Sequence, residues 1–537
     1  MSSSDAGKNL EHIGEGKWLL VYLMFTAMIS GALVMVIEVL GSRVIGPFFG
    51  VSLFVWTSLI AVTLISLSLG YAIGGHIADK RGTAEYLYGI ILLAGVAVLL
   101  IPFLKSAVLK FCLPLGLRWG AFVSTALLFG PALFLLGCVS PYLVKIAASE
   151  LKSIGRTVGG LYALSTVGSV IGTVLTGFVL IAYLGVDSIF YLVGTLLVFL
   201  ALVFFVFFRR IRWAASLAAL PFIIFLTDTD AIPDKVMKNG TRVSMVASHD
   251  SYYGNLKVVE YSYGNKRTRE LIIDGLIQGG IDVNSGQSIY AYSYYLTLLP
   301  YALHPEIERA LVIGMGAGIV PRWFEQQGIR TDVVDIDPTV FDYARRYFGV
   351  KVSGREFTQD ARYFAQSSRD TYDVVVLDVF TGDTTPAHLL SLESLRLVGE
   401  RLADQGVLAI NLVGSLYTDN YMTASIVRTL REVFDQVDVY PTVDLAKKDG
   451  GNLAVIAYQG ARRQPDFSRI DAFDISHYAR DNVLANLGRR FEFPEGTPAI
   501  VLTDDYNPVD FFDAGLKEDV RRDILDTTEW DILIFSD

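Results

Sequence analysis

Three aspartates close short stretches that are predicted to be strands in the second half of the chain, where they could bind or activate a small molecule. Asp335 ends TDVVD, Asp360 ends REFTQD, and Asp378 ends YDVVVLD. From Ala310 onward, stretches of this kind alternate with helical patterns, which predicts a parallel, doubly wound sheet of the Rossmann type. Ligands of such sheets bind outside the carboxyl ends of the strands. We therefore expect the three carboxylates to face one ligand crevice.

A glycine-rich turn precedes these acids and indicates which ligand the crevice takes. The stretch LVIGMGAGIVPRWF places three glycines between a strand and a helix, namely Gly314, Gly316 and Gly318. Glycines let the backbone bend tightly and let a ligand approach without interference from Cβ atoms. Asp335 could accept hydrogen bonds from both ribose hydroxyls of a nucleoside. Asp360 could accept one from an adenine amino group, so an adenosyl compound is the expected ligand.

Each of these residues also has a structural alternative. The glycine turn could be a tight join between strand and helix, and Asp360 could cap a helix that begins at Ala361. Asp378 could bond to the amides of its own loop. Asp337, followed by Pro338, is typical of the cap of the next helix. The succession of signals along one sheet favours a binding site.

The apolar residues are unevenly distributed along the 537-residue chain, which is long enough for two or three domains. Hydrophobic residues make up 52% of the chain and charged residues only 19%. Nearly all of the excess lies before Thr227, in runs that reach the roughly 20 residues needed to cross a bilayer. The sequence therefore predicts four regions: a multi-span α-helical membrane domain at 1–227, a linker at 228–240, a small antiparallel β module at 241–283, and a Rossmann-like catalytic domain at 284–537.

Charge and cysteine content exclude some classes of function. The net charge of −10 argues against a nucleic-acid partner and suits a cationic substrate. Cys112 and Cys138 both fall in the apolar half, so we expect neither a disulfide framework nor a metal site. The first apolar segment lacks a cleavage signal and is expected to be a retained span.

Six spans are expected, near 18–40, 52–74, 86–104, 119–145, 157–184 and 188–208, and a shorter apolar run at 213–227 could add a seventh. The stretch AVLKFCLPLG could be re-entrant or a further span. Ten basic residues fall in or beside the loops on the N-terminal side, against four on the other: Arg43, Lys105, Lys110 and Arg118. This bias places the N-terminus inside the cell. Six or eight spans would keep the soluble domain in the cytoplasm, whereas seven would place it outside.

Two features of the apolar half leave a transport function open. Glu38 lies within the first span, where an ionisable group indicates function unless it pairs with Arg43 at a helix end. GHIADKRG, from Gly75 to Gly82, is similar to the loop between the second and third spans of major facilitator transporters. A transporter or sensor with a ligand-binding soluble domain is therefore one alternative.

The soluble half resembles the spermidine synthases, the polyamine aminopropyltransferases, through five motifs in order: LIIDGLIQGG, LVIGMGAGI, VVDIDPTVFDYARRYF, FTQDARYF and YDVVVLDVFTGDTTP. A membrane half followed by such a domain, and the later LTDDYNPVDFF, are similar to membrane-bound bacterial members. The resemblance implies that Gln278 contacts the nucleoside donor and Asp335 its ribose. It also implies that Asp360 with Ala361 holds the adenine, and that Asp378 is the catalytic carboxylate.

The chain departs from this family at the expected amine site. The family's Tyr-His-Glu triplet falls on Tyr292, Ser293 and Tyr294, so only the tyrosine is retained. The acid that binds the donor's aminopropyl ammonium is replaced by Ala317. The acid after the catalytic one is replaced by Thr381, with Asp383 two residues later. Compensation could come from Asp383, Tyr292 or the acids of LTDDYNP, Asp504 and Asp505.

The resemblance implies transfer of an aminopropyl group from decarboxylated S-adenosylmethionine, as co-substrate, to putrescine or a related amine. No permanently bound cofactor is expected. A methyltransferase that uses intact S-adenosylmethionine is the second alternative, and Ala317 favours it. Because the donor is made in the cytoplasm, we expect the catalytic domain there, at the inner face of the cell membrane. Soluble relatives commonly self-associate, so a homo-oligomer is in keeping with the family.

Overall fold

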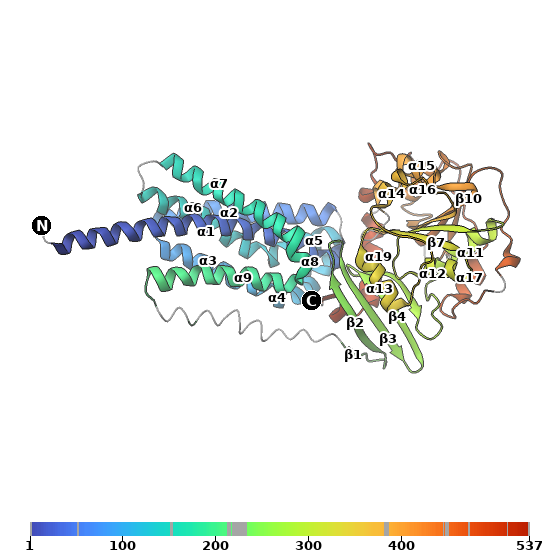
Figure 1. Ribbon diagram of the computed structural model, residues 1–537, viewed down its shortest axis with the longest axis horizontal. Coiled ribbons are helices and arrows are strands. Elements are labelled where there is room, and N and C mark those ends of the chain that lie inside the picture. Colours follow the sequence, from blue (N-terminus) through green and yellow to red (C-terminus); the bar gives the residue numbers. More distant parts are fainter. Residues whose placement is uncertain are drawn as a thin grey trace. The chain divides into compact units, whose positions relative to one another are not determined.

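The computed structural model describes residues 3–50, 53–150, 154–211, 216, 234–380, 386–443, 445, 450–470, 473–512 and 514–534. The chain divides into two compact units, one of Met1–Ala231 with Ile534–Asp537 and one of Ile232–Leu533. The first unit is helical and the second combines helices with two sheets (Figure 1). The apolar run expected at 213–227 lies outside the described residues except for Ser216.

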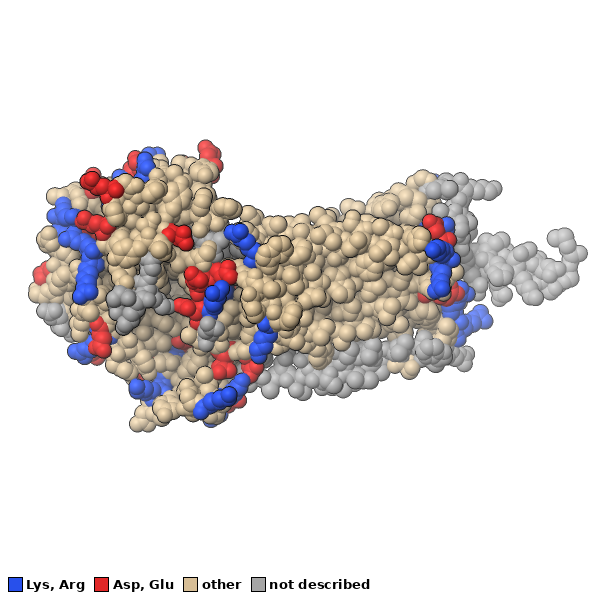
Figure 2. Space-filling view, turned by 180° about the vertical axis from the view of Figure 1, so that it is seen from behind, with Lys and Arg blue, Asp and Glu red and all other residues tan. Residues whose placement is uncertain are grey.

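The helical unit contains nine α-helices within the described residues: α1 (Ser3–Phe49), α2 (Leu53–Arg81), α3 (Ala84–Leu99), α4 (Ile101–Cys112), α5 (Gly116–Leu128), α6 (Gly130–Glu150), α7 (Ile154–Leu175), α8 (Ile181–Tyr183) and α9 (Val186–Val203). Six segments of the described part of the chain are long and apolar enough to cross a membrane. Figure 2 shows the side of this unit as a surface without Lys, Arg, Asp or Glu on the face in view, with charges gathered at its end.

Consecutive helices join into longer rods. The amide of Leu100 donates to the carbonyl oxygen of Val96 at 3.1 Å, so α3 continues into α4. The amide of Phe129 likewise donates to Thr125 at 3.0 Å, so α5 continues into α6. A 3-10 turn at Leu113–Leu115 separates the two rods. The described residues thus form six rods, namely α1, α2, α3–α4, α5–α6, α7 with α8, and α9. If each crosses the membrane once, the start of α1 and the end of α9 lie on the same side.

Small residues let α1 and α7 pack side by side (Figure 1). A Cβ atom on Gly168 would lie 1.9 Å from the carbonyl oxygen of Met28, and one on Gly31 would lie 2.3 Å from that of Ser165. Such contacts are typical of helices that associate in a membrane, where backbones approach at small residues. The two helices therefore form one rigid pair.

Two sequence expectations for this unit are wrong. Lys105, expected in a loop, lies buried in α4 and pairs with Asp187 in the first turn of α9. It therefore cannot be counted as a loop charge, which lowers the basic count on that side from four to three. GHIADKRG was expected between helices, but all of it except Gly82 belongs to α2.

The β module is a five-stranded antiparallel sheet in the order β1 to β5, formed by β1 (Asp234–Val236), β2 (Arg242–Asp250), β3 (Asn255–Tyr263), β4 (Lys266–Ile273) and β5 (Leu276–Asp282). The stretch RELIIDGLIQGG forms two strands rather than one. Asp274 (φ 48°) and Gly275 (φ 76°) make the tight turn between them, which is the usual role of Asp-Gly in a hairpin. The expected linker at 228–240 contains β1.

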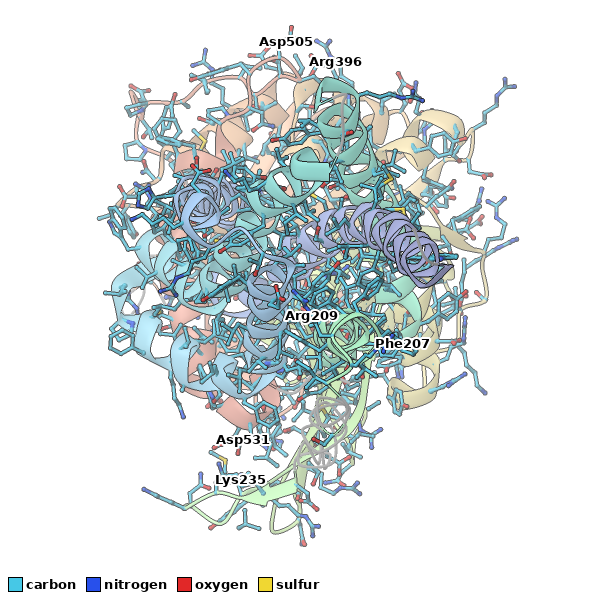
Figure 3. All side chains as sticks on the ribbon, turned by 90° about the vertical axis from the view of Figure 1, so that its left-hand side faces the viewer. Phe207, Arg209, Lys235, Arg396, Asp505 and Asp531 are labelled. Carbon is cyan, nitrogen blue, oxygen red and sulfur yellow. The ribbon has the colours of Figure 1, made fainter. Side chains whose placement is uncertain are left out.

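The end of the chain returns to this module. Its last helices are α18 (Val509–Phe512), α19 (Ala514–Thr527) and α20 (Trp530–Ile534). Ile532 of α20 packs with Val243, Val259 and Ile272, and the buried Lys257 donates to the carbonyl oxygen of Ile532 at 2.6 Å. Lys235 pairs with Asp531 at 2.9 Å (Figure 3). Residues at the end of the described chain therefore complete the β module's core.

The second sheet has seven strands in the order β11-β12-β10-β9-β6-β7-β8. They are β6 (Arg309–Ile313), β7 (Arg330–Asp335), β8 (Glu356–Thr358), β9 (Tyr372–Leu377), β10 (Leu402–Ser415), β11 (Gln436–Pro441) and β12 (Gly450–Tyr458). β12 is antiparallel to both its neighbours, while the strands from β10 to β8 are parallel. This confirms the doubly wound sheet, with the addition of one antiparallel strand.

Helices cover both faces of this sheet. One core contains side chains of α11 (Ala291–Leu303), α12 (Ile319–Gln326), α13 (Pro338–Phe348) and α17 (Arg480–Asn486). The other contains side chains of α14 (Ala361–Ser367), α15 (Leu392–Gly399) and α16 (Tyr421–Arg431). The strands are thereby held with their carboxyl ends along one edge.

Candidate functional site

Asp378 lies at the carboxyl end of the central strand pair. β9 runs between β6 and β10, and the Asp378 amide donates to the carbonyl oxygen of Ile313 at 2.8 Å. Its Oδ1 accepts a 2.8 Å hydrogen bond from Nδ2 of Asn411 on β10. Oδ1 of Asn411 in turn accepts from Nδ2 of Asn452 on β12 at 3.0 Å. Two asparagines from neighbouring strands thus fix the orientation of this carboxylate.

Burial raises the pKa of the Asp378 carboxyl to about 6, and the hydrogen bond from Asn411 opposes that rise. Asp378 is partly exposed at the sheet edge, but protein surrounds it closely enough to weaken its hydration. A carboxylate with a pKa near neutrality is a better proton acceptor than an ordinary aspartate. The site therefore holds a group suited to general-base chemistry.

The glycine turn brings β6 against both β9 and β5. Gly314 has φ 98°, and a Cβ atom there would lie 2.0 Å from the carbonyl oxygen of Asp378. Gly316 has φ 47°, and its Cβ would lie 2.9 Å from the carbonyl oxygen of Gln278. Gly318 (φ 70°) precedes α12 in the left-handed conformation. Glycine is therefore required at positions 314 and 316, as expected, because the backbones of Asp378 and Gln278 leave no room for a Cβ atom.

Asp335 links the glycine turn to the start of α13. Its Oδ2 accepts from the Met315 amide at 2.8 Å, and its Oδ1 accepts from the Asp337 amide at 2.9 Å. Burial nevertheless raises the pKa of the Asp335 carboxyl to about 6. Each carboxylate oxygen can accept a further hydrogen bond, so bonds to ribose hydroxyls remain open to it.

The β module is attached at the same place. Asp337 caps α13 by accepting from the Thr339 amide, as expected. Its Oδ2 accepts a 2.6 Å hydrogen bond from the buried hydroxyl of Ser251, in the turn between β2 and β3. Ser251 Oγ also accepts from the amides of Tyr253 and Gly254. The β2–β3 turn and the Asp335 edge are therefore joined through one serine.

Asp360 is the N-cap of α14, as its structural alternative predicts. Its side chain accepts from the Tyr363 amide at 2.9 Å, and its Oδ2 lies 3.4 Å from Nε2 of His388. Ala361 begins the helix. Asp504 is bonded to Arg362, which lowers the pKa of the Asp504 carboxyl to about 2. Asp504 therefore secures this end of the site and is not free to replace an acid of the amine site.

Tyr292 approaches Asp378 from the β module side. Its hydroxyl lies 3.5 Å from the carbonyl oxygen of Gln278. Burial raises the pKa of Tyr292 well above its usual value, and the nearby charge of Asp378 adds to the rise. Ala317 is buried, and its Cβ lies 3.1 Å from the position of a Cβ on Gly279. The structure therefore brings Tyr292, Gln278 and the glycine turn around Asp378.

The remaining expected amine residues lie elsewhere or are not described. Ser293 is buried and its hydroxyl donates to the carbonyl oxygen of Tyr290 at 2.9 Å, within the first turn of α11. The Tyr294 hydroxyl donates to the carbonyl oxygen of Ser288 at 3.0 Å. Thr381 and Asp383 lie outside the described residues.

Sequence reasoning missed several residues near the acids. Two of them had a signal in the sequence that was not used. Asn411 is a polar residue within the apolar run VLAINLV, and Ile336 is an apolar residue between two acids. Ile336 is 41% exposed at the carboxyl edge. Glu270 of β4 and Tyr290 gave no signal, because their contact depends on the pairing of β4 with β5.

Comparisons with known proteins show what the stretch that contains this site is similar to. Residues 289–444 match the model of the spermine/spermidine synthase domain. A stretch of 130 residues is 40% identical to the N-terminal histidine N-methyltransferase of Emericella nidulans, covering 23% of each chain. A stretch of 155 residues is 33% identical to the polyamine aminopropyltransferase of Vibrio vulnificus, covering 28% of this chain and 50% of that one. The chain thus spans half or less of the length of these two curated relatives.

Among solved structures, this chain is similar to the probable spermidine synthase of Corynebacterium glutamicum. The two are 18% identical with a TM-score of 0.35, and the match covers 43% of this chain and 95% of that one. The spermidine synthase of Thermotoga maritima is 17% identical to this chain with a TM-score of 0.36, and the match covers 47% of this chain and 84% of that one. The family match confirms the resemblance expected from the five motifs. The stretch 289–444, which contains Asp335, Asp360 and Asp378, is therefore similar to the spermine/spermidine synthase domain.

Proposed function

We propose that the α/β unit transfers an aminopropyl group from decarboxylated S-adenosylmethionine to putrescine or a related amine, giving spermidine and methylthioadenosine. The observation that carries the proposal is the Asp378 carboxylate, desolvated, fixed by Asn411 and adjacent to the glycine turn. It lies within the stretch that matches the spermine/spermidine synthase domain.

The donor would lie along the carboxyl edge of β6, β7 and β8. In this arrangement Asp335 accepts from the ribose hydroxyls, and Asp360 with Ala361 binds the adenine amino group and ring edge. Ile336 offers an apolar contact to the base. Gly314, Gly316 and Gly318 admit the rest of the donor beside Gln278 without side chains in the way.

Asp378 would act on the acceptor amine. An alkyl amine has a pKa near that of lysine, about 10.4, and is mostly protonated at neutral pH. Attack requires the neutral amine, whose lone pair forms a bond to the carbon next to the sulfonium. The carbon–sulfur bond breaks, its electron pair stays on sulfur, and the proton of the amine passes to the Asp378 carboxylate.

N-Methylation by intact S-adenosylmethionine is a second candidate, which two observations favour. Ala317 stands where the family has an acid for the donor's aminopropyl ammonium, so this position offers no charge that selects the decarboxylated donor. The similar protein of Emericella nidulans is an N-methyltransferase. In this reaction the same carboxylate would take the proton of the attacking nitrogen.

The adenosyl by-product separates the two reactions. The full-length protein is incubated with putrescine and each donor in turn, and the nucleoside products are identified by mass spectrometry. Methylthioadenosine together with spermidine supports aminopropyl transfer. S-Adenosylhomocysteine with a methylated amine would establish the second candidate instead. Asp378→Asn serves as the control, since neither product should form at the wild-type rate.

We also propose that the six rods anchor the α/β unit in the cell membrane, with that unit on the cytoplasmic side. The six rods formed by the described residues give an even number of crossings if each crosses once. This number and the excess of basic residues on the N-terminal side support the placement. Protease added to intact cells should leave the α/β unit whole, and protease added to inside-out vesicles should cleave it. Cleavage in intact cells would contradict the placement.

A further inference from the structure

Glu270 is a buried carboxylate without a cationic partner. It lies on β4, opposite Gly280 of β5, and is 9% exposed. Its Oε1 accepts a 2.6 Å hydrogen bond from the hydroxyl of Tyr290. No Lys, Arg or His among the described residues lies within ion-pair distance of it. A buried charge is costly unless it is paired, so the folded chain leaves this position ready for a cation.

The surroundings of Glu270 are aromatic and leave room for its side chain. A Cβ atom on Gly280 would lie 2.9 Å from Cγ of Glu270 and 3.1 Å from Cε2 of Tyr290, so glycine is what permits this arrangement. The Tyr290 and Tyr292 rings stack with centroids 6.3 Å apart. Burial raises the pKa of Glu270, and the bond from Tyr290 opposes the rise.

The two tyrosines connect Glu270 with Asp378. The Tyr290 hydroxyl donates a hydrogen bond to Glu270, and the Tyr292 ring stacks on that of Tyr290. The charge of Asp378 lies close enough to the Tyr292 hydroxyl to raise its pKa. Tyrosine faces attract ammonium groups, and carboxylates bond to them. The stacked rings of Tyr290 and Tyr292 thus have a carboxylate at each end, Glu270 beside Tyr290 and Asp378 beside Tyr292. Only Asp378 is proposed to accept a proton.

We propose that Glu270, with Tyr290 and Tyr292, binds the distal ammonium of a diamine acceptor while its other nitrogen faces Asp378. This assignment rests on the proposed function and adds the selection of diamines over monoamines. It also accounts for the loss of the acid at position 381, because the acceptor's second charge is met from the β module instead. Glu270 is a specificity-determining residue and takes no part in the bond changes.

The experiment compares putrescine with butylamine, which lacks the second ammonium. The full-length protein in lipid nanodiscs is assayed with each acceptor at saturating donor. The wild type should use putrescine at a far lower KM. Glu270→Gln, which keeps the size of the side chain and a group for the Tyr290 bond, should raise the KM for putrescine about 10- to 100-fold. The KM for butylamine and the KM for the donor should stay unchanged.

Glu260→Gln is the matched control. Glu260 lies on the adjacent strand β3 and already pairs with Arg267 at 2.6 Å and Arg269 at 2.7 Å. It should leave both acceptor KM values unchanged. Tyr290→Phe, which removes one hydroxyl, should raise the putrescine KM by less than Glu270→Gln. An equal rise for putrescine and butylamine in Glu270→Gln would show a merely structural role and overturn the proposal.

Two further measurements keep the test independent of the variant's folding and of the reaction. Equal KM values of the wild type for putrescine and butylamine would refute diamine selection without any substitution. Equilibrium binding of labelled putrescine to wild type and Glu270→Gln gives a readout without turnover. If the only nucleoside product is S-adenosylhomocysteine, the proposed function fails; weaker putrescine binding by Glu270→Gln would still support the site, and unchanged binding would overturn it.

Discussion

Buried charges have charged partners in the helical unit and neutral partners near the carboxyl edge of the α/β unit. In the helical unit, Lys105 (7% exposed) and Asp187 (5% exposed) come from different rods and neutralise each other. At the carboxyl edge, Asp378 has a neutral amide as its hydrogen-bond partner, and in the β module Glu270 has a neutral phenol. Away from that edge, the same unit pairs its buried Asp332 with Arg355 at 2.8 Å.

The difference separates charges that hold the fold from charges that are available to a ligand. A buried ion pair contributes little net stability but becomes very costly when one member is lost. An unpaired buried carboxylate is costly in the empty protein and is stabilised when a cation binds. The comparison therefore predicts opposite consequences for neutralising a charge in the two regions.

The largest expected effect is on catalysis. Asp378→Asn removes the proton acceptor while keeping the shape of the side chain, and should lower kcat by about 10²- to 10⁴-fold. The rate of nucleoside product formation by the full-length protein measures this. Donor binding, followed by equilibrium dialysis, should be retained. A rate within threefold of the wild type would remove Asp378 from the mechanism.

The next effect is on the stability of the helical unit. Lys105→Met leaves Asp187 buried and unpaired, which should lower the free energy of unfolding by about 3–5 kcal/mol. Chemical unfolding in detergent micelles measures the loss. The double variant Lys105→Met/Asp187→Leu should recover most of it, because no charge is then buried. Failure of the second substitution to restore stability would contradict the pairing.

Neutralising the charge at the carboxyl edge should have the opposite sign. The folded-state pKa of Asp378, about 6, lies above the unfolded value of 3.8. This group therefore contributes stability below the unfolded pKa and loses it as pH rises through the folded pKa. Above that window Asp378→Asn should be more stable than the wild type, by up to about 3 kcal/mol. Thermal unfolding at pH 5 and pH 8 should show the gain mainly at pH 8.

A smaller effect is expected on the pH dependence of the rate. Asp378 must be ionised to accept a proton, so wild-type activity should rise as pH increases through about 6. Asn411→Ala removes a hydrogen bond that favours the ionised form, and should move this limb to higher pH by about one unit. A kcat profile from pH 5 to 9 tests it. An unmoved limb would mean that Asn411 has no influence on the Asp378 carboxyl.

The smallest effect provides a control for the ion pair in the helical unit. Lys145 pairs with Asp79 at 2.9 Å on the surface, where both side chains are largely exposed. Lys145→Met should leave the free energy of unfolding almost unchanged, because water already solvates both charges. A loss as large as that of Lys105→Met would show that burial is not what distinguishes the two pairs.

Local patterns were sufficient to predict the parallel strands and most of the acids at their ends. Alternating strands and helices, the glycine turn and the Asp-Pro cap all depend on neighbours in sequence. Asp335 and Asp378 were therefore placed correctly at strand ends, and Asp337 was placed correctly as the cap of α13. The same reasoning gave the six apolar rods, because span length and hydropathy are local properties.

Contacts between distant strands and helices were beyond that reasoning. The Lys105–Asp187 pair joins residues 82 positions apart, so Lys105 was assigned to a loop. The Asn452–Asn411–Asp378 chain requires β12 to turn back antiparallel beside β10. Glu270 acquires its environment only because Gly280 lies opposite it in the register. Each depends on a strand or helix pairing that no single motif encodes.

The Ser251 hydroxyl joins the β2–β3 turn to the sheet edge at Asp335 and Asp337, so the two should open together in local unfolding. The Ser251 hydroxyl accepts hydrogen bonds from the amides of Tyr253 and Gly254 and donates one to the Asp337 carboxylate. The amide of Asp337 in turn donates to the Asp335 carboxylate. Breaking this chain at any link exposes several amides together, which is how cooperative local unfolding appears in hydrogen exchange. A nucleoside seated on Asp335 should therefore slow deuterium uptake at Tyr253 and Gly254, residues that it need not touch.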